Sequence, residues 1–490
     1  MLRIYTRRVL LFAIFFSSLI FSFPAHVFSQ HKEYFPDPDP VIQQRLEDWQ
    51  DLKFGLLMHW GTYSQWGIVE SWSICPEDLS WAVGGQKPGV TDNYNEYVQK
   101  YTALKNTFNP VKFNPDKWAA AAREAGMKYM VFTTKHHDGF CMFDSKYTDY
   151  KITDQKCPFS ANPSANITKE VFNAFRKNNF WIGAYFSKPD WHSDYYWWKK
   201  FPASDRNANY SIQKHPDQWR KFVDFTHNQV AELLTDYGKV DILWLDGGWV
   251  RKNTAEEINT QLSDTTEGSR YARNPQSQDI DMAGLVKESR AKQPGLIVVD
   301  RAVPGPHQNY LTPEQHIPEK GLPYPWETCM TMASSWSYVP NDVYKPTEEL
   351  IEKLVEIVSK GGNYLLNIGP GPDGEFDPIA YERLKEIGGW MKRNGEAIYG
   401  SRMYTRHAET KGVHYTRAKD NKTIYVFLSD FPTGPIDLPL LAANDRLRVT
   451  MPGSNKKLSW KRKSDKITLT IPAGMKQLSN FVWVLKVQQQ

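Results

Sequence analysis

The stretch Val240-Asp241-Ile242-Leu243-Trp244-Leu245-Asp246-Gly247-Gly248 is an apolar run that ends in a carboxylate and two glycines. A short apolar run bounded by turn residues is typical of a strand that is buried on both faces. The bare backbone of the two glycines would let a ligand approach the Asp246 carboxylate closely. Asp246 is therefore a candidate site residue, with the cap of a following helix as its alternative role.

Five further runs of this kind lie on either side of the first, and amphipathic helical patterns separate them. The runs are Phe54–Trp60, Tyr129–Lys135, Trp181–Ser187, Leu296–Arg301 and Asn363–Ile368. The helical patterns are Asp116–Ala125, Thr168–Lys177, Gln218–Tyr237 and Thr347–Ser359. Apolar strands that alternate with helices predict a parallel sheet covered on both faces. The first strand is followed by no Gly-x-Gly-x-x-Gly dinucleotide motif. Because six strands with room for one or two more fit a closed sheet best, we predict an α/β fold, a (β/α)8-like TIM barrel that need not be regular.

Most of the predicted strands end in polar or charged residues. These are His59 in the first run, His136, His137 and Asp138 after the second, Tyr185 and Lys188 at the third, Asp246 at the fourth and Arg301 at the fifth. In a (β/α) barrel the active site lies at the C-terminal ends of the strands. The pattern therefore predicts a catalytic face at that end of the barrel.

Two adjacent histidines occur in Lys135-His136-His137-Asp138-Gly139-Phe140. Side chains of neighbouring residues in an extended backbone point apart, so we expect the two imidazoles not to bind one metal ion together. A neutral imidazole both donates and accepts hydrogen bonds, which suits a ligand with many hydroxyl groups, such as a sugar. The alternative is one structural and one functional histidine.

After Gly400 the pattern changes to short strands separated by turns. The runs Thr423–Ser429, Leu447–Met451 and Ile467–Ile471 are joined by Asp-Asn, Pro-Gly and Ser-Asp turns without a long helical pattern. We predict a C-terminal β-sandwich at residues 401–490, with a packing role or a carbohydrate-binding role, after a barrel domain at residues 30–400. Pro36–Pro40 is interpreted as a stiff linker in front of the barrel.

Residues 1–29 have the features of a signal peptide. Arginines precede an apolar run from Val9 to about Phe21, and small or neutral residues then lead to a cleavage site before Gln30. The apolar run is too short for a stable membrane span, and an uncleaved membrane anchor is the alternative. We therefore expect an exported protein, periplasmic or secreted, with no stable membrane insertion.

The overall composition is that of a globular protein with an excess of aromatic residues, 14% of the 490. Aromatic rings in this number fill a large core or form the floor of a carbohydrate site. The net charge of +5 is small and scattered along the chain, which argues against a nucleic-acid partner. The four cysteines have no zinc-site spacing, and we expect mostly buried free thiols.

Four motifs resemble those of the family 29 glycoside hydrolases, the α-L-fucosidases. They are Phe54-Gly55-Leu56-Leu57-Met58-His59-Trp60-Gly61, then Lys135–Phe140 continuing to Asp144–Thr148, Trp244-Leu245-Asp246-Gly247, and Gly361-Gly362-Asn363-Tyr364-Leu365-Leu366-Asn367-Ile368-Gly369-Pro370. The resemblance extends from about residue 40 to 405, and the motifs occur in the order of that family.

The resemblance implies a role for individual residues. Asp246 matches the nucleophile, and Arg301 resembles an active-site arginine. The positions implied to contact the fucose are His59, His136, His137, Tyr185 and Trp244, together with Glu70 and Trp72 from a loop of variable length. For the general acid and base, Glu314 in Thr312-Pro313-Glu314 resembles one branch of the family, and Glu327 in Trp326-Glu327-Thr328-Cys329 is the rival.

The function implied is that of an exo-acting retaining α-L-fucosidase, which removes terminal α-L-fucose from glycans by double displacement. Such an enzyme needs an ionised nucleophile and a protonated acid, and neither a metal nor another cofactor. The expected partners are fucosylated oligosaccharides or glycoconjugates, and the oligomeric state is left open. Two alternatives are a metal-dependent barrel hydrolase that uses His59, His136, His137 and Asp246, and a catalytically idle or differently specific sugar-binding barrel.

Overall fold

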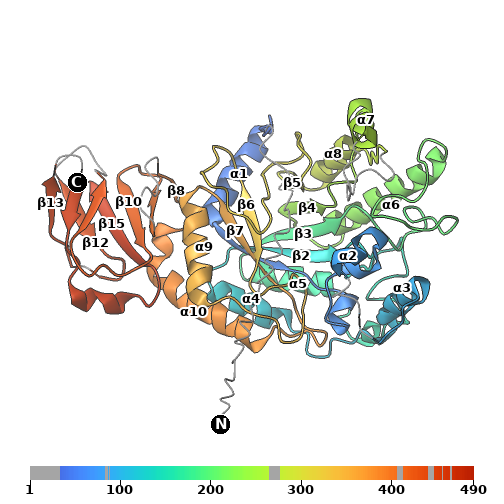
Figure 1. Cartoon of the computed structure of the whole chain (residues 1–490), viewed down its shortest axis with the longest axis horizontal. Helices are drawn as coiled ribbons and strands as arrows, with labels where there is room; N and C mark the ends of the chain where they lie inside the picture. Colours follow the sequence, from blue (N-terminus) through green and yellow to red (C-terminus); the bar gives the residue numbers. More distant parts are fainter. Residues whose placement is uncertain are drawn as a thin grey trace, which may run out of the picture.

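A computed structural model describes residues 34–82, 87, 89–263, 276–404, 412–439, 446–454, 456–463 and 466–489. Within these residues the chain forms a parallel barrel-like sheet surrounded by helices, followed by antiparallel strands (Figure 1). The predicted signal peptide, residues 1–29, lies outside the described residues. In the part of the chain that is described, no helix has both the length and the apolar character needed to cross a membrane.

Seven parallel strands form the central sheet. They are β1 Phe54–Met58, β2 Tyr129–Lys135, β3 Trp181–Ser187, β4 Ile242–Asp246, β5 Ile297–Asp300, β6 Glu327–Thr331 and β7 Asn363–Ile368. Their order is β5-β4-β3-β2-β1-β7-β6, and all neighbouring strands are parallel. The six predicted strands are confirmed. The sequence pattern did not name β6, because a strand that begins with Glu327 and contains two threonines does not stand out as an apolar run.

An irregular segment, residues 307–315, spans the gap between β5 and β6. On one side, the Asn309 amide donates to the Val298 carbonyl at 3.0 Å. On the other side, Leu311 and Glu314 form parallel bridges to Trp326 and Cys329. This segment continues the curled sheet from β5 to β6 without regular strand geometry. The (β/α)8-like barrel is therefore confirmed, with seven regular strands and Glu314 on the irregular connection.

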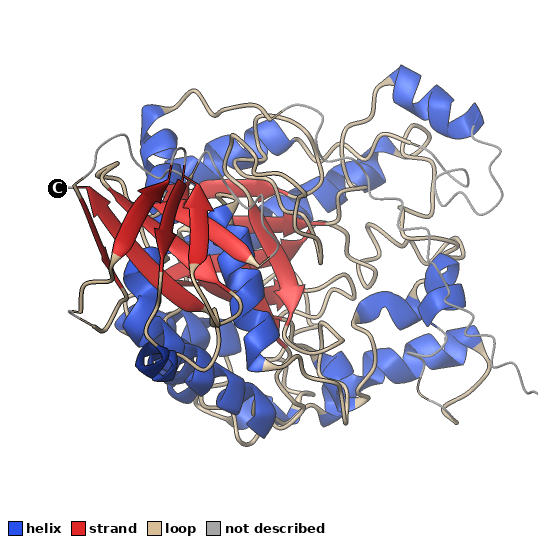
Figure 2. Ribbon diagram, turned by 60° about the vertical axis from the view of Figure 1, so that its left-hand side comes forward, coloured by secondary structure: helices blue, strands red, loops and turns tan. Residues whose placement is uncertain are grey.

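Helices lie around the barrel, and most of them cover its outer surface (Figure 2). They are α1 Pro40–Leu52, α2 Leu79–Ala82, α3 Tyr94–Thr102, α4 Pro115–Glu124, α5 Ile167–Lys177, α6 Pro216–Thr235, α7 Ala255–Ser263, α8 Met282–Lys292, α9 Thr347–Ser359 and α10 Pro378–Asn394. The four predicted helical patterns correspond to α4, α5, α6 and α9, with bounds that differ by at most two residues. Helix α5 shows the reason, since Val171, Phe172 and Phe175 lie buried on one face.

The N-terminal segment before α1 packs against the barrel instead of acting as a linker. Asp37 is 4% exposed, and its carboxylate accepts hydrogen bonds from Arg290 at 2.7 Å and from Asn309 at 3.0 Å. Asp39 then caps α1 through the Val41 amide at 2.8 Å, and Pro40 is the first helical residue. The prediction of a stiff linker at Pro36–Pro40 was wrong, because buried hydrogen bonds hold this segment in place.

The C-terminal strands form two antiparallel sheets, in the order β12-β15-β10-β9-β8 and β11-β14-β13. The strands are β8 Arg402–Met403, β9 Val413–Arg417, β10 Thr423–Leu428, β11 Ile436–Pro439, β12 Leu447–Thr450, β13 Trp460–Lys463, β14 Lys466–Leu469 and β15 Trp483–Gln489. Val426, Leu485 and Ile467 belong to the apolar core between the sheets, as the β-sandwich prediction requires. Tyr425 and Phe427 belong instead to the main core, so the sandwich packs tightly on the barrel domain.

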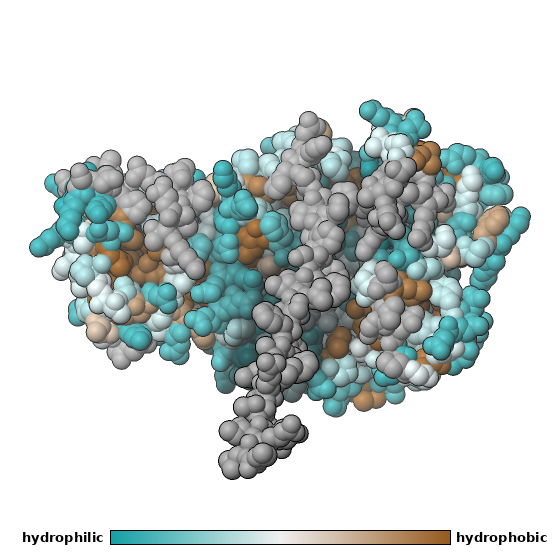
Figure 3. Space-filling view, in the orientation of Figure 1, coloured by the Kyte–Doolittle hydropathy of each residue, from teal (hydrophilic) through white to brown (hydrophobic). Residues whose placement is uncertain are grey.

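Most of the large aromatic side chains lie in the core. Fully buried examples are Trp49, Trp60, Trp118, Trp244, Trp326, Tyr63 and Tyr185. The molecular face in Figure 3 is mostly hydrophilic or neutral, with hydrophobic residues in small separate groups. Trp72 and Trp336 are only partly buried, and both lie near the ends of the parallel strands. Most of the aromatic residues therefore pack in the core, and a few partly exposed rings can line a ligand site.

Lys53 is an unusual buried cation at the junction of α1 and β1. Its side chain is fully buried, and among the described residues its Nζ atom has no hydrogen-bond partner. Burial lowers the pKa of Lys53 to about 7, the nearby Arg402 lowers it further, and Asp51 and Glu47 only partly offset these effects. Placing an unpaired ammonium group in this position costs folding free energy.

We predict that Lys53→Met raises the melting temperature at pH 7 by several degrees. Between about pH 7 and pH 10 the unfolded chain binds the lysine proton and the folded chain does not, so wild-type stability rises with pH across this window. The advantage of the variant, on the order of 2–4 kcal/mol at pH 7, should therefore shrink toward pH 10. Thermal unfolding between pH 6 and pH 10 measures this, with Lys252→Met, whose side chain is 80% exposed, as the control. A wild-type melting temperature equal to that of Lys53→Met at pH 7 would contradict it.

Candidate active site

Asp246 is the last residue of β4 and lies among hydrogen-bond donors at the C-terminal end of the barrel. Its Oδ1 atom accepts from the Gly247 amide at 2.8 Å and from Arg301 at 3.2 Å. Its Oδ2 atom accepts from the Tyr185 hydroxyl at 2.7 Å. The Asp246 side chain keeps 17% of its surface exposed. The carboxylate is therefore held firmly on three sides and open to a ligand on the remaining side.

These donors determine the charge of Asp246. Burial alone would raise the pKa of Asp246, but the Arg301 guanidinium and the hydrogen bonds from Tyr185 and Gly247 outweigh it and hold the pKa well below the usual range of an aspartate. Gly247 adopts φ +89°, and a Cβ atom there would lie 2.3 Å from the Pro189 ring. The glycine after the strand is thus required both for the turn and for the amide that binds the carboxylate.

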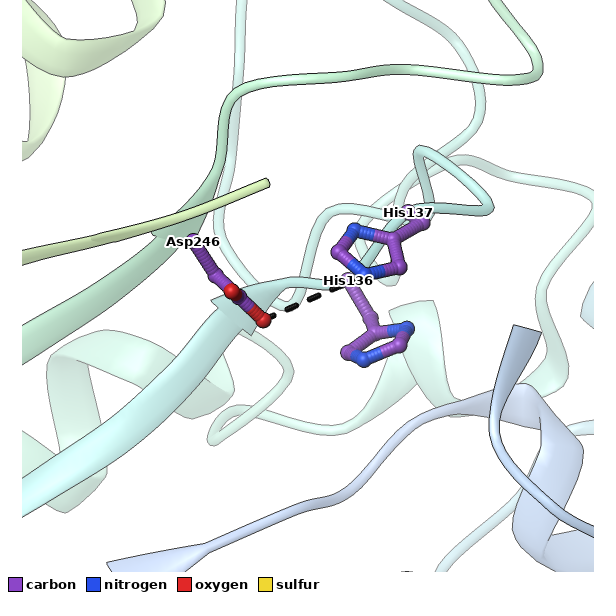
Figure 4. Close-up of side chains that lie close together, drawn as sticks. All are labelled: His136, His137 and Asp246. Carbon is purple, nitrogen blue, oxygen red and sulfur yellow. Dashed lines mark ion pairs between the residues drawn. The ribbon is translucent and has the colours of Figure 1, made fainter. Parts of the chain in front are cut away.

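His136 and His137 both lie beside Asp246 (Figure 4). Their ring centroids are 4.2 Å apart, and the Nε2 atom of His137 is 3.9 Å from Asp246 Oδ2. The expectation that adjacent imidazoles point apart was wrong, because β2 ends at Lys135 and the second histidine already lies in the turn that follows. Two histidines therefore serve the same site.

Hydrogen bonds orient each imidazole through its Nδ1 atom. Ser71 contacts His136 at 2.5 Å, Ser187 contacts His137 at 2.6 Å, and Asn367 contacts His59 at 2.8 Å. Burial lowers the pKa of all three histidines, that of His137 to about 4. The three rings are therefore neutral at pH 7, and each Nε2 atom can donate a hydrogen bond to a hydroxyl group or accept one from it, according to the tautomer.

His59 and Tyr185 complete the floor and one side of the site. The His59 ring lies 5.4 Å from the Tyr185 ring and 5.2 Å from the Trp336 ring, measured between centroids. Tyr185 stacks on Trp244 at 5.2 Å, and the Arg301 guanidinium lies 5.1 Å from the Trp244 ring. Trp244 is 1% exposed, so it supports Tyr185 and Arg301 from below.

The loop after β1 contributes Glu70 and Trp72. The Trp72 ring lies 5.0 Å from the His137 ring and 6.0 Å from the Trp249 ring. Arg206 packs over both tryptophans, at 5.0 Å from Trp72 and 5.1 Å from Trp249. The Glu70 side chain accepts a hydrogen bond from the Ser337 amide at 2.7 Å, which ties this loop to the segment after β6. Both predicted loop residues thus lie at the rim of the same site.

Glu314 shares the Arg301 guanidinium with Asp246. Nη2 of Arg301 donates to Glu314, and Nη1 of the same side chain donates to Asp246 at 3.2 Å. The Glu314 side chain is 44% exposed, compared with 17% for Asp246. One carboxylate of the pair is therefore buried, and the other faces the solvent.

Glu327 lies below this site, inside the barrel. Its side chain is fully buried and accepts hydrogen bonds from Tyr129 at 2.7 Å and from the Trp244 indole at 3.2 Å. Burial raises the pKa of Glu327 to about 7. Because Trp244 stands between Glu327 and the layer of Tyr185 and Arg301, Glu327 supports the floor of the site and has no contact with solvent.

His136, His137 and Asp246 also form a group that could hold a metal ion. Both oxygens of Asp246 already accept hydrogen bonds, and the positively charged Arg301 on one of them repels a dication. A second group consists of Cys75, Glu77 and Asp78, and its two carboxylates form ion pairs with Arg206 at 2.5 and 2.8 Å. In both places an arginine already supplies the positive charge that a metal ion would bring.

Sequence reasoning missed several residues of the site, of which five illustrate the reason. They are Ser71, Ser187, Trp249, Trp336 and Asn367, which orient the three histidines or pack against them. Trp249 follows Gly247-Gly248 directly, and Asn367 lies in the late strand motif, so their positions offered a signal. The two serines offered none, since their role depends on hydrogen bonds between separate loops.

The α-L-fucosidase family model matches residues 22–396, and the model of the α-L-fucosidase C-terminal domain matches residues 406–488. The chain belongs to the α-L-fucosidase family. As a member it is a glycoside hydrolase, and the predicted family and enzyme class are confirmed.

Relatives of this fucosidase resemble it over nearly its whole length. It is 29% identical to the tissue α-L-fucosidase of Mus musculus, over 93% of this chain and 95% of the relative, and 30% identical to that of Rattus norvegicus, over 90% and 88%. Among solved structures, α-L-fucosidase isoenzyme 1 from Paenibacillus thiaminolyticus has a TM-score of 0.72 at 29% identity, covering 92% of this chain and all of that one. The Thermotoga maritima α-fucosidase in complex with fucose has a TM-score of 0.69 at 26% identity, covering 93% of this chain and all of that one.

Proposed function

We propose that the chain is an exo-acting retaining α-L-fucosidase in which Asp246 is the nucleophile and Glu314 is the general acid and base. The observation that carries the proposal is the Arg301 guanidinium, which contacts a buried, ionised carboxylate and a solvent-facing one at the C-terminal ends of the strands. Retaining glycosidases need two carboxyl groups with unequal roles, nucleophile and proton donor, on either side of the bond that is cleaved.

In the first step the Asp246 carboxylate attacks the anomeric carbon of the fucose. The bond to the leaving oxygen breaks, and Glu314 donates its proton to that oxygen. A protonated Glu314 is a weaker acceptor for Arg301, so the guanidinium then stabilises mainly Asp246. The Glu314 side chain is 44% exposed, so its carboxyl group can reach a leaving group that enters from the solvent side.

In the second step water hydrolyses the ester between fucose and Asp246. The Glu314 carboxylate accepts a proton from the water, whose oxygen attacks the anomeric carbon and releases Asp246. Arg301 and Tyr185 stabilise the carboxylate charge as it returns. Two inversions at the same carbon give net retention.

The remaining residues would bind the fucose ring. His59, His136 and His137 are neutral, and because hydrogen bonds occupy their Nδ1 atoms, we propose that their Nε2 atoms bind the sugar hydroxyl groups. Trp72 and Trp336 offer partly exposed rings beside these histidines. A ring of neutral donors and acceptors with flat aromatic walls favours a neutral sugar, and we propose fucosylated oligosaccharides or glycoconjugates as substrates.

The first test is hydrolysis of an aryl α-L-fucoside before and after treatment with EDTA. We expect full activity in both samples, because the proposed mechanism uses only side chains of the chain. Loss of activity that returns on adding a divalent metal would support the metal-dependent alternative at His136, His137 and Asp246. A sample that binds fucose but does not hydrolyse the fucoside would support the idle sugar-binding alternative.

We also propose that the protein is exported and that residues 1–29 are removed. The arginine-flanked apolar run and the small residues before Gln30 support this proposal. The intact mass of the periplasmic or secreted product should correspond to a chain that begins near Gln30. A product that still carries Met1 would contradict cleavage and favour the uncleaved anchor.

A further inference from the structure

A buried ion pair joins the strands on either side of Asp246. Lys188 directly follows β3, and Asp300 is the last residue of β5. The Lys188 ammonium donates to the Asp300 carboxylate across the end of β4, the strand between them. The two side chains are 0% and 3% exposed, so the pair is closed off from water.

Stability alone is a poor explanation for this pair. Removing two charges from water costs about as much free energy as their attraction returns, and apolar residues of similar size often do equally well. What a buried pair can supply is a fixed arrangement of the elements that carry it.

The backbone beside each partner is tied to the nucleophile strand. The Lys188 amide donates to the Asp246 carbonyl at 2.9 Å, and the Arg301 amide donates to the Leu245 carbonyl at 3.1 Å. The strands carrying the pair also carry the two side chains that hold the nucleophile, Tyr185 on β3 and Arg301 just after β5. The spacing of β3 and β5 at this end therefore decides whether both side chains reach Asp246.

We propose that the Lys188–Asp300 pair is a positioning element that holds Tyr185 and Arg301 against the Asp246 carboxylate. The proposal rests on the proposed function, since it takes Asp246 as the nucleophile. Neither Lys188 nor Asp300 contacts the sugar in this account. They act through Arg301, which also contacts Glu314, and through Tyr185. The other titratable groups that face Asp246 are His136, His137 and His59.

The test replaces the pair by apolar residues, in the double variant Lys188→Met/Asp300→Leu. We expect it to fold with a melting temperature near that of the wild type, because no unpaired charge remains. We expect kcat/KM for an activated aryl fucoside to fall about 10- to 100-fold. The acid limb of its pH profile should move upward by about one pH unit, because a loosened Arg301 no longer keeps Asp246 ionised.

Two further variants keep the test decisive. Asp300→Asn changes the side-chain volume very little, and we expect a fall in kcat/KM from this variant even if the double variant fails to fold. Arg45→Met removes a partner of Asp241, which lies directly before the start of β4 at its opposite end and still pairs with Lys239. We expect this control to leave the acid limb unchanged.

A wild type without fucosidase activity would overturn the proposed function. If the wild type is active and the folded double variant, or Asp300→Asn, has the same acid limb and the same kcat/KM as the wild type, only the positioning role is overturned.

Discussion

Asp246→Ala is expected to lower kcat by several orders of magnitude, on the order of 10³–10⁵-fold, without unfolding the protein. The reason is that the covalent step disappears, while Arg301, Tyr185 and the histidines stay in place. Steady-state hydrolysis of a nitrophenyl fucoside measures the loss. A circular dichroism spectrum and a melting temperature close to those of the wild type show that the fold is kept.

Rescue by azide tests the role of Asp246 as the nucleophile more specifically than the loss of activity does. The alanine leaves space beside the anomeric carbon, so azide should enter from the Asp246 side, partly restore turnover and give the β-fucosyl azide. Asp246→Asn is the matched control, because its amide fills the same space and should not be rescued. If Asp246→Ala kept more than a few per cent of its activity without azide, Asp246 would not be the nucleophile.

Glu314→Ala is expected to lower activity on natural fucosides far more than on a nitrophenyl fucoside. A general acid matters most for a poor leaving group, such as a sugar hydroxyl, and little for an activated phenol. With the activated substrate, hydrolysis of the glycosyl-enzyme should become limiting. Azide should then accelerate turnover and give the α-fucosyl azide, because Asp246 still performs the first inversion. The anomer of the azide product thus separates the two carboxylates.

Glu327→Ala is the comparison for this prediction. The Glu327 side chain holds the Trp244 indole and the Tyr129 hydroxyl in the barrel interior. We therefore expect its loss to weaken hydrolysis of both classes of fucoside alike, with no azide product. If leaving-group dependence and azide rescue appeared in Glu327→Ala and not in Glu314→Ala, the two roles would have to be exchanged.

The sequence predicted the barrel well because its strands are short apolar runs between amphipathic helices. Six of the seven regular strands could be identified in this way, whereas β6 could not, since Glu327 and two threonines interrupt its pattern. The irregular segment that carries Glu314 also has no periodic pattern, because its hydrogen bonds go to two different strands. The fold was thus predictable where local pattern and burial agree.

The residues of the candidate site could be predicted from the sequence, but the hydrogen bonds and ion pairs between them could not. Asp246, Arg301 and the histidines could be named because polar residues at strand ends are conspicuous. The single Arg301 side chain that reaches both carboxylates, and the serines that orient His136 and His137, depend on loops far apart in the sequence. The adjacent histidines were expected to point apart, and the turn after Lys135 brings them together instead.

The most direct test of the central claim is the identity of the residue that becomes covalently attached to the sugar. A 2-fluoro-fucosyl fluoride slows breakdown of the glycosyl-enzyme more than its formation, because fluoride is a good leaving group and the fluorine at C2 destabilises both transition states. Peptide mass spectrometry of the inactivated enzyme should find one fluorofucosyl group on the peptide that contains Asp246. A label on Glu314 or Glu327, or active enzyme that is never labelled, would contradict the account.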